Sequence, residues 1–263
     1  MTLVAESAVS RDGEIYRAEV HPGWDVRGNA NGGYLMAIAA RAMAAKSGRA
    51  PLTLTAHFLA PAACGPVSVT PTLLKSGRRF STMRATLASP ERPLLELLGS
   101  FADWQTLDGP TRVDASPPEL PAPDACVVLD SFPGGSMQVF TSILDLRIHP
   151  DDAGFMSGVP SDRSLLRGWL RFRDEPVDAF ALLVAADVFP PSIFNTHLPS
   201  AWTPTIELTA HLRSQPCEGW LRCQFSTRCI AGGLLEEDGE LWDESGQLVA
   251  QTRQLALLPR AQS

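Results

Sequence analysis

The sequence has no membrane-spanning run, and its cysteines form no recognisable pattern. No apolar stretch reaches the roughly 18 residues that a membrane span needs. The amino-terminal segment MTLVAESAVSRDGE lacks the basic and apolar regions of a signal peptide. The five cysteines are odd in number and include no C-x-x-C pair, which argues against a disulfide framework and a zinc site. We therefore expect a cytoplasmic protein with reduced cysteines, no metal and no membrane partner.

Positive charge and several catalytic motifs are also scarce or missing. With 22 Lys and Arg against 29 Asp and Glu, the net charge is −7, so no nucleic-acid partner is expected. The patterns G-x-S-x-G, H-E-x-x-H and G-x-x-x-x-G-K-[ST] are absent, which disfavours a serine hydrolase, a zinc protease and a P-loop protein. What the chain does have is 44% hydrophobic residues, enough for a sizeable core.

A tetrapeptide, Leu-Thr-Ala-His, occurs twice, beginning at Leu54 and at Leu208. Each copy follows a mostly apolar, helix-like segment, GNANGGYLMAIAARAMAAKSG (28–48) in the first half and EPVDAFALLVAADVF (175–189) in the second. A strand-like segment precedes each helix, and several follow each copy of the tetrapeptide. The shared order of strand, buried helix and several strands predicts a tandem duplication.

The first helix has clear boundaries. Asn29 or Asn31 can cap its start, and Lys46 and Gly48 are typical of its end. Small and apolar residues lie almost all round it, so we expect a sheet to wrap it. Residues 105–135 are rich in proline and predict a crossover linker between an N-terminal unit, 1–104, and a C-terminal unit, 136–263.

Several segments resemble acyl-CoA thioesterases of the type II family, which have a double hotdog fold. Those segments are GNANGGYLMAIAARA (28–42), HFLAP (57–61), AADVFPPSIF (185–194), TPTIELTAHL (203–212) and GELWDESGQLVAQTRQLAL (239–257). The resemblance implies an α+β tandem hotdog, with two antiparallel sheets that each wrap a long central helix. It also implies an acyl-CoA or acyl-pantetheine substrate, a role in fatty acid metabolism, no cofactor, and a homo-oligomer of double-hotdog chains.

The resemblance assigns the attacking water to three residues of the C-terminal unit, namely Asp187, Thr205 and Gln254. A carboxylate can accept a proton from water while a hydroxyl and an amide fix the position of that water. From the residues alone, each has another explanation. Asp187 can simply face solvent or cap the Pro190-Pro191 turn, Thr205 can be an ordinary strand residue, and Gln254 can be an exposed strand position. The hypothesis depends on all three together.

Asn31, Gly32 and Gly33 are the candidate oxyanion or substrate-binding residues. The first N–H groups of a helix have no partner within the helix, glycines let a ligand approach the backbone, and the helix dipole favours negative charge there. The alternative is that Gly32 and Gly33 only allow close packing in a tight turn.

Other polar groups fit less well. His57 and His211 occupy equivalent positions in the repeat, so we expect a structural role for them. The only basic clusters able to meet the phosphates of coenzyme A are Arg78 with Arg79, and Arg163, Arg167, Arg171 and Arg173, which can equally be solvated faces.

Comparison of the two halves predicts a single functional site. The repeat places Thr205 over Pro51 and Gln254 over Ser100, and the helix of residues 31–45 contains no acid. Two other functions stay open. One is an acyl-thioester binding protein without activity. The other is a hotdog enoyl-CoA hydratase, which is disfavoured because no Asp and His lie a few residues apart on the second helix.

Overall fold

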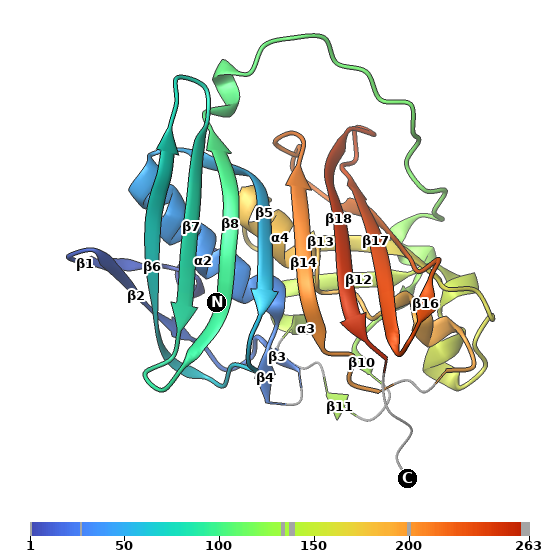
Figure 1. The fold of residues 1–263 in the computed structure, drawn as a ribbon. Coiled ribbons are helices and arrows are strands. Elements are labelled where there is room, and N and C mark those ends of the chain that lie inside the picture. Colours follow the sequence, from blue (N-terminus) through green and yellow to red (C-terminus); the bar gives the residue numbers. More distant parts are fainter. Residues whose placement is uncertain (1, 27, 133–134, 137–139, 199–200, 259–263) are drawn as a thin grey trace.

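One antiparallel sheet runs through the whole molecule, with the helices packed against one of its faces (Figure 1). The computed structural model describes residues 2–26, 28–132, 135–136, 140–198 and 201–258. The sheet has 14 strands in the order β1-β2-β6-β7-β8-β5-β14-β18-β17-β15-β13-β12-β9, and β16 pairs with β17. Two further pairs of short strands, β3 with β4 and β10 with β11, lie outside it.

The strands of the N-terminal half are β1 (Ser10–Asp12), β2 (Ile15–Val20), β3 (Asp25–Val26), β4 (Asn29–Ala30), β5 (Ala50–Phe58), β6 (Gly65–Ser76), β7 (Ser81–Ala88) and β8 (Pro93–Ala102). The later strands are β9 (Val127–Val128), β10 (Ser131–Phe132), β11 (Gly135–Ser136), β12 (Leu144–Ile148), β13 (Leu165–Phe172), β14 (Thr205–Leu212), β15 (Leu221–Ser226), β16 (Ile230–Ala231), β17 (Leu234–Trp242) and β18 (Leu248–Leu257). The α-helices are α1 (Leu3–Glu6), α2 (Gly32–Ser47), α3 (Phe140–Ile143) and α4 (Ala179–Ala185). Short 3-10 helices are η1 (Trp104–Thr106), η2 (Pro123–Ala125), η3 (Pro150–Asp152), η4 (Gly154–Ser157) and η5 (Ser192–Asn195). None of the helices in the described ranges has the length and apolar character of a membrane span.

Both halves have the same strand order. The first half runs β2-β6-β7-β8-β5 across the sheet and the second runs β13-β15-β17-β18-β14. In chain order the main helix of each half, α2 or α4, comes after strand β2 or β13 and before four main strands. This arrangement is the one that the repeated tetrapeptide predicts.

The two copies of the tetrapeptide pair with each other at the centre of the sheet. Thr55 on β5 lies opposite Thr209 on β14, and their hydroxyl oxygens are 2.8 Å apart. The expectation of two separate sheets is therefore wrong, because this pairing joins the strands of both halves into one sheet. Each of these two strands would otherwise present unpaired backbone groups at an edge, and their pairing satisfies both.

Helix α2 matches its prediction. The Asn31 side chain caps its start by accepting from the backbone N–H of Tyr34, and Gly48 ends it with a φ of 68°. The second helix is shorter than expected from residues 175–189. Its first turn is capped by Asp178, and its last backbone bond, from the N–H of Asp187 to the carbonyl of Val184, already has the tighter spacing of a 3-10 turn.

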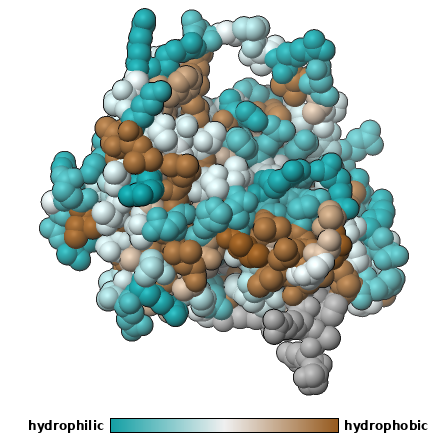
Figure 2. Space-filling model, viewed as in Figure 1, coloured by the Kyte–Doolittle hydropathy of each residue, from teal (hydrophilic) through white to brown (hydrophobic). Residues whose placement is uncertain are grey.

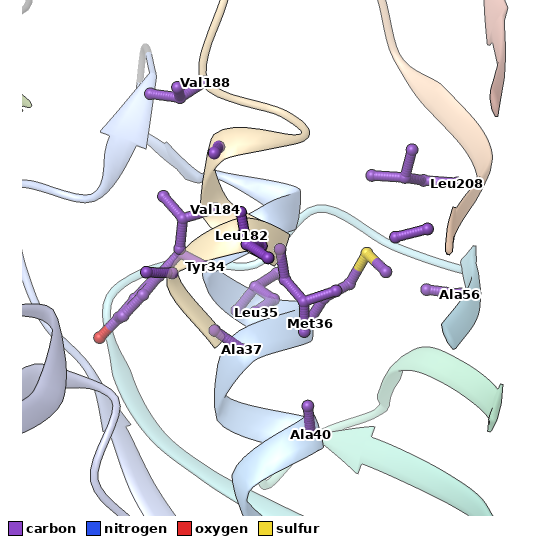
Figure 3. Close-up of a cluster of buried hydrophobic side chains, with 14 of the residues drawn as sticks. Tyr34, Leu35, Met36, Ala37, Ala40, Ala56, Leu182, Val184, Val188 and Leu208 are labelled. Carbon is purple, nitrogen blue, oxygen red and sulfur yellow. The ribbon is translucent and has the colours of Figure 1, made fainter. Parts of the chain in front are cut away.

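The two helices pack on each other beneath the centre of the sheet. Figure 3 shows Leu35 and Met36 of α2 close to Leu182 of α4, with Ala56 and Leu208 from the paired strands facing them. Every one of these side chains is 0–2% exposed. This core fixes the start of α2 against the end of α4, and the candidate site lies at that junction.

The proline-rich crossover passes over one end of the sheet as a long connection (Figure 1). It contributes β9, which pairs with β12 at the edge of the second half. The strand-like segment that the sequence predicts before the second helix is MQVFTSILDLRIHP (137–150). Residues 137–139 lie outside the described residues, and the strand that follows helix α3 begins at Leu144.

The face of the sheet that is turned away from the helices is largely hydrophilic, with separate hydrophobic areas (Figure 2).

Candidate active site

A cavity of about 520 Å³ lies between the two halves. Its wall is built from the start of α2, the segment that follows α4, and strands β5, β14, β15, β17 and β18. Most of the wall is apolar, as in sites that accept small organic ligands. The polar side chains that line it include Asn31, Asp187, Thr205, Glu237 and Gln254.

Asp187 is held by the start of α2. Its Oδ2 atom accepts hydrogen bonds from the backbone N–H of Gly33 at 2.9 Å and from Asn31 Nδ2 at 3.0 Å. The same Asn31 amide also donates to the Asp187 carbonyl oxygen at 2.7 Å. Asn31 is thus both the cap of α2 and a fixed support for the carboxylate of the other half.

Glycine is required at this contact. A Cβ at Gly33 would lie 2.4 Å from the Leu183 carbonyl oxygen and 3.1 Å from the Asp187 Cβ, and a Cβ at Gly32 would lie 2.9 Å from Asp187 Oδ2. The close packing expected of these glycines is therefore present, whereas the Gly33 N–H, a predicted oxyanion donor, is engaged by Asp187 Oδ2. The anion that the donor holds is the carboxylate of Asp187.

Burial raises the pKa of Asp187 to about 6, against the lowering effect of the hydrogen bonds from Gly33, Gly32 and Asn31. The low-polarity surroundings disfavour the charged carboxylate more strongly than these donors stabilise it. A carboxylate with a pKa in this range can both exist in its charged form at neutral pH and accept a proton from water.

Thr205 and Gln254 lie together on neighbouring strands. Gln254 Nε2 donates to Thr205 Oγ1, and both residues line the cavity. Gln254 stands opposite the buried Leu208 on β14, so it lies on the face of the sheet that packs on the helices, where it is partly buried. The bond also orients the Gln254 amide. Its nitrogen points to Thr205, so its Oε1 atom can accept a hydrogen bond from another group.

Glu237 is a cavity residue that the sequence interpretation missed. It stands opposite Gln254 on β17, is 7% exposed, and accepts a hydrogen bond from the backbone N–H of Ser192 to Oε2 at 2.6 Å. Burial raises the pKa of Glu237 to about 7, against the lowering effect of its hydrogen bonds with Ser192. The charge of Asp187 makes a smaller contribution in the same direction as burial. The alternation in LLEEDGELW could have revealed it, since Glu237 shares a face with the apolar Leu235 and Leu241.

The register corrects one comparison between the halves. Leu54 pairs with Gly99 where Leu208 pairs with Gln254, so Gln254 corresponds to Gly99 and not to Ser100. The error of one position arose from aligning the last strands by their letters, without the partner strands. A Cβ at Gly99 would lie 2.5 Å from the Thr53 carbonyl oxygen, which leaves no space for an amide side chain there.

The opposite junction between α2 and α4, at the start of α4, is filled by side chains. Arg41 of α2 lies 3.5 Å from the Asp178 carboxylate at the start of α4, and its guanidinium stacks over the Phe180 ring at 4.3 Å. The two helix starts are thus different, since one faces the cavity and the other is covered by an arginine and a phenylalanine.

The histidines and the arginine clusters lie elsewhere. His57 and His211 alternate with the inward-facing residues of β5 and β14, and neither lines the cavity. Arg163 and Arg167 bind the buried Asp152, Arg171 and Arg173 bind Asp145, and Arg79 pairs with Asp108. These guanidinium groups are engaged in ion pairs within the chain.

Comparison with known proteins shows the family of the chain. Residues 20–102 match the model of the acyl-CoA thioesterase N-terminal domain, and residues 123–258 match that of the acyl-CoA thioesterase C-terminal domain. The chain therefore belongs to the acyl-CoA thioesterase family.

Three individual proteins illustrate the likeness. A structure from Thermobifida fusca, described as a candidate thioesterase II, is 30% identical with a TM-score of 0.88, and the match covers 98% of this chain and 97% of that one. A hotdog-fold protein of unknown function from Alicyclobacillus acidocaldarius shares the fold, at 19% identity, a TM-score of 0.85 and 99% and 98% coverage. An uncharacterised protein of Mycobacterium tuberculosis is 26% identical over 266 residues, covering 93% of this chain and 91% of its own.

Proposed function

We propose that this protein hydrolyses an acyl-CoA thioester, with Asp187 as the general base for the attacking water. The observation that carries the proposal is the partly buried Asp187 carboxylate at the wall of an apolar cavity, held by the α2 start, in a chain of the acyl-CoA thioesterase family. The Thr205–Gln254 pair lines the same cavity.

In this mechanism the water donates one hydrogen bond to Asp187 and the other to Gln254 Oε1. Thr205 keeps the Gln254 amide in the orientation that offers this oxygen. The water oxygen then attacks the thioester carbonyl carbon while Asp187 accepts the proton. When the tetrahedral intermediate collapses, the carbon–sulfur bond breaks and the proton passes from Asp187 to the leaving sulfur. The products are a carboxylic acid and free coenzyme A.

The start of α2 has two tasks in this scheme. Before the reaction, the N–H groups at Gly32 and Gly33 stabilise the negative charge of Asp187. During attack, Asp187 becomes neutral while the carbonyl oxygen of the substrate becomes negative. We assign Asn31, Gly32 and Gly33 to the stabilisation of that oxyanion, because the positive end of a helix favours whichever neighbouring group carries the charge.

Release of thiol from a panel of acyl-CoAs tests the proposal against its two alternatives. Thiol release supports hydrolysis. Hydration of an enoyl-CoA without thiol release would support a hydratase. A thermal shift with acyl-CoA but without turnover would support an acyl-thioester binding protein.

The first prediction concerns pH. Because Asp187 acts in its charged form and its pKa is raised to about 6, kcat/KM should increase about tenfold per pH unit below pH 6 and level off above it. Among the described residues that line this cavity the other acidic side chain is Glu237, so the Glu237→Gln variant should keep the ascending limb. A limb centred near pH 4, the ordinary range of an exposed aspartate, would contradict the assignment.

The second prediction is one functional site per chain. The first half has Gly99 in place of Gln254, and Arg41 with Phe180 covers the start of α4. Calorimetric titration with a non-hydrolysable thioether analogue of acyl-CoA should therefore give one site per chain. A stoichiometry of two equal sites would show that the halves are not specialised.

A further inference from the structure

The second carboxyl group of the cavity has no task in water activation. Glu237 lies on β17, beyond Gln254 as seen from β14, so about two strand spacings, or roughly 10 Å of sheet, separate its backbone from that of β14. The cavity continues past it to Phe194 and Phe225. The acyl chain of a thioester held beside Asp187 would extend along this wall.

The fold itself does not require an acid at this place. In the first half, Met83 on β7 pairs with Gly99 as Glu237 on β17 pairs with Gln254, so Met83 is the counterpart of Glu237. Met83 is fully buried in an ordinary apolar core. A carboxyl group at the same position in the second half is costly to bury unless its polar atoms have partners.

Ser192 supplies hydrogen bonds to this carboxyl group. Its backbone N–H donates to Oε2 at 2.6 Å, and its side chain, which also lies 3.0 Å from Thr227 Oγ1, forms a further hydrogen bond that lowers the pKa of Glu237. The carboxyl group also lines the cavity among aromatic side chains, where a bound acyl chain can meet it. The raised pKa of Glu237 makes its protonated form available near neutral pH, so it can donate to an oxygen atom as well as accept from a hydroxyl.

We propose that Glu237 selects acyl chains that carry a hydroxyl or keto oxygen a few carbons from the thioester, by a direct hydrogen bond in the cavity. This inference rests on the proposed thioesterase function and specifies its substrate class. An unsubstituted chain would leave the carboxyl group without that partner, whereas an oxygenated chain satisfies it. Discrimination of this kind is larger than discrimination by an added methylene, because the penalty falls on a buried polar group.

The test compares hexanoyl-CoA with its 3-hydroxy, 4-hydroxy and 5-hydroxy derivatives. The wild-type protein should prefer at least one hydroxylated chain in kcat/KM by roughly tenfold or more. The Glu237→Met variant, which copies the first half, should lose this preference and keep or increase its activity on hexanoyl-CoA. Glu237→Gln should retain part of it, because an amide can still accept from Ser192 and bind a hydroxyl. Glu240→Gln on the same strand, outside the cavity, is the matched control and should leave the preference unchanged.

Three outcomes would overturn the assignment. The same preference in the wild-type protein and in Glu237→Met would show that Glu237 does not contact the chain. No preference in the wild-type protein would show that the cavity does not select oxygenated chains. An equal loss on all four substrates in Glu237→Met would show that the residue only supports Gln254 or the Ser192 turn. Binding of the corresponding thioether analogues separates this proposal from the thioesterase proposal. A hydroxyl preference in binding that Glu237→Met abolishes, without any turnover, would support Glu237 recognition and refute hydrolysis.

Discussion

Asp187→Asn should lower kcat/KM for acyl-CoA hydrolysis by roughly 100- to 10,000-fold, the usual contribution of a general base. The substitution keeps the shape of the side chain, and its amide oxygen can still accept from Gly33 and Asn31. What is lost is the ability to take a proton from water. Thr205→Ala and Gln254→Ala should each cost less, because Asp187 still accepts the proton when one of the residues that position the water is missing.

The stability of the same variant provides a check that it folds. The folded-state pKa of Asp187 lies above its ordinary value of 3.8, so its ionisation between about pH 4 and pH 6 destabilises the fold. Asp187→Asn removes this effect and should increase the free energy of unfolding at pH 8, but not at pH 3, by roughly 1 to 3 kcal/mol.

Asp238 on β17 is the matched control for Asp187. Its carboxylate binds Arg253, which holds its pKa below the ordinary range. Asp238→Asn should therefore lose stability at neutral pH and keep its turnover, the reverse of Asp187→Asn on both counts. Normal hydrolysis by a folded Asp187→Asn protein would refute the role of this residue as the base.

Gly33→Ala should both destabilise the protein and reduce its activity. Helix propensity alone predicts the opposite sign, since alanine favours a helix by up to about 1 kcal/mol over glycine. Here the added Cβ would lie 2.4 Å from the Leu183 carbonyl oxygen, so the end of α4 must move. We expect a loss of about 1 to 3 kcal/mol in unfolding free energy and, because Asp187 moves with α4, a loss of about 100-fold in kcat/KM.

Gly32→Ala separates this contact from a general intolerance of alanine. Its added Cβ would lie 2.7 Å from the Phe58 ring and 2.9 Å from Asp187 Oδ2, and these side-chain atoms can move more easily than the backbone met at Gly33. Thermal unfolding should therefore show a smaller loss for Gly32→Ala than for Gly33→Ala, although its turnover should also fall because the added carbon touches the Asp187 carboxylate. A Gly33→Ala protein with raised thermal stability and unchanged turnover would mean that α2 and α4 are not in the contact that we describe.

Much of the architecture follows from local sequence. The apolar run after Asn31, ended by Gly48, fixed the first helix almost to the residue, because caps and helix-ending glycines act within a few positions. The repeated Leu-Thr-Ala-His likewise indicated two units with the same strand order. The resemblance of local segments also placed Thr205 and Gln254 as candidates, and the structure brings them into contact.

Other features depend on atoms far apart in the chain. The sequence could not show that β5 and β14 pair to make one sheet, because the pairing is made by backbone groups that every residue carries and leaves no local signal in the side chains. It could not align Gln254 with Gly99, since register is set by the partner strand. It also gave no reason to connect Gly33 with Asp187, or to place Glu237 in the same cavity. The sequence by itself determined the candidate residues of the water site and the ends of the first helix. The raised pKa values and the shared cavity arise only when tertiary packing removes the carboxyl groups of Asp187 and Glu237 from water.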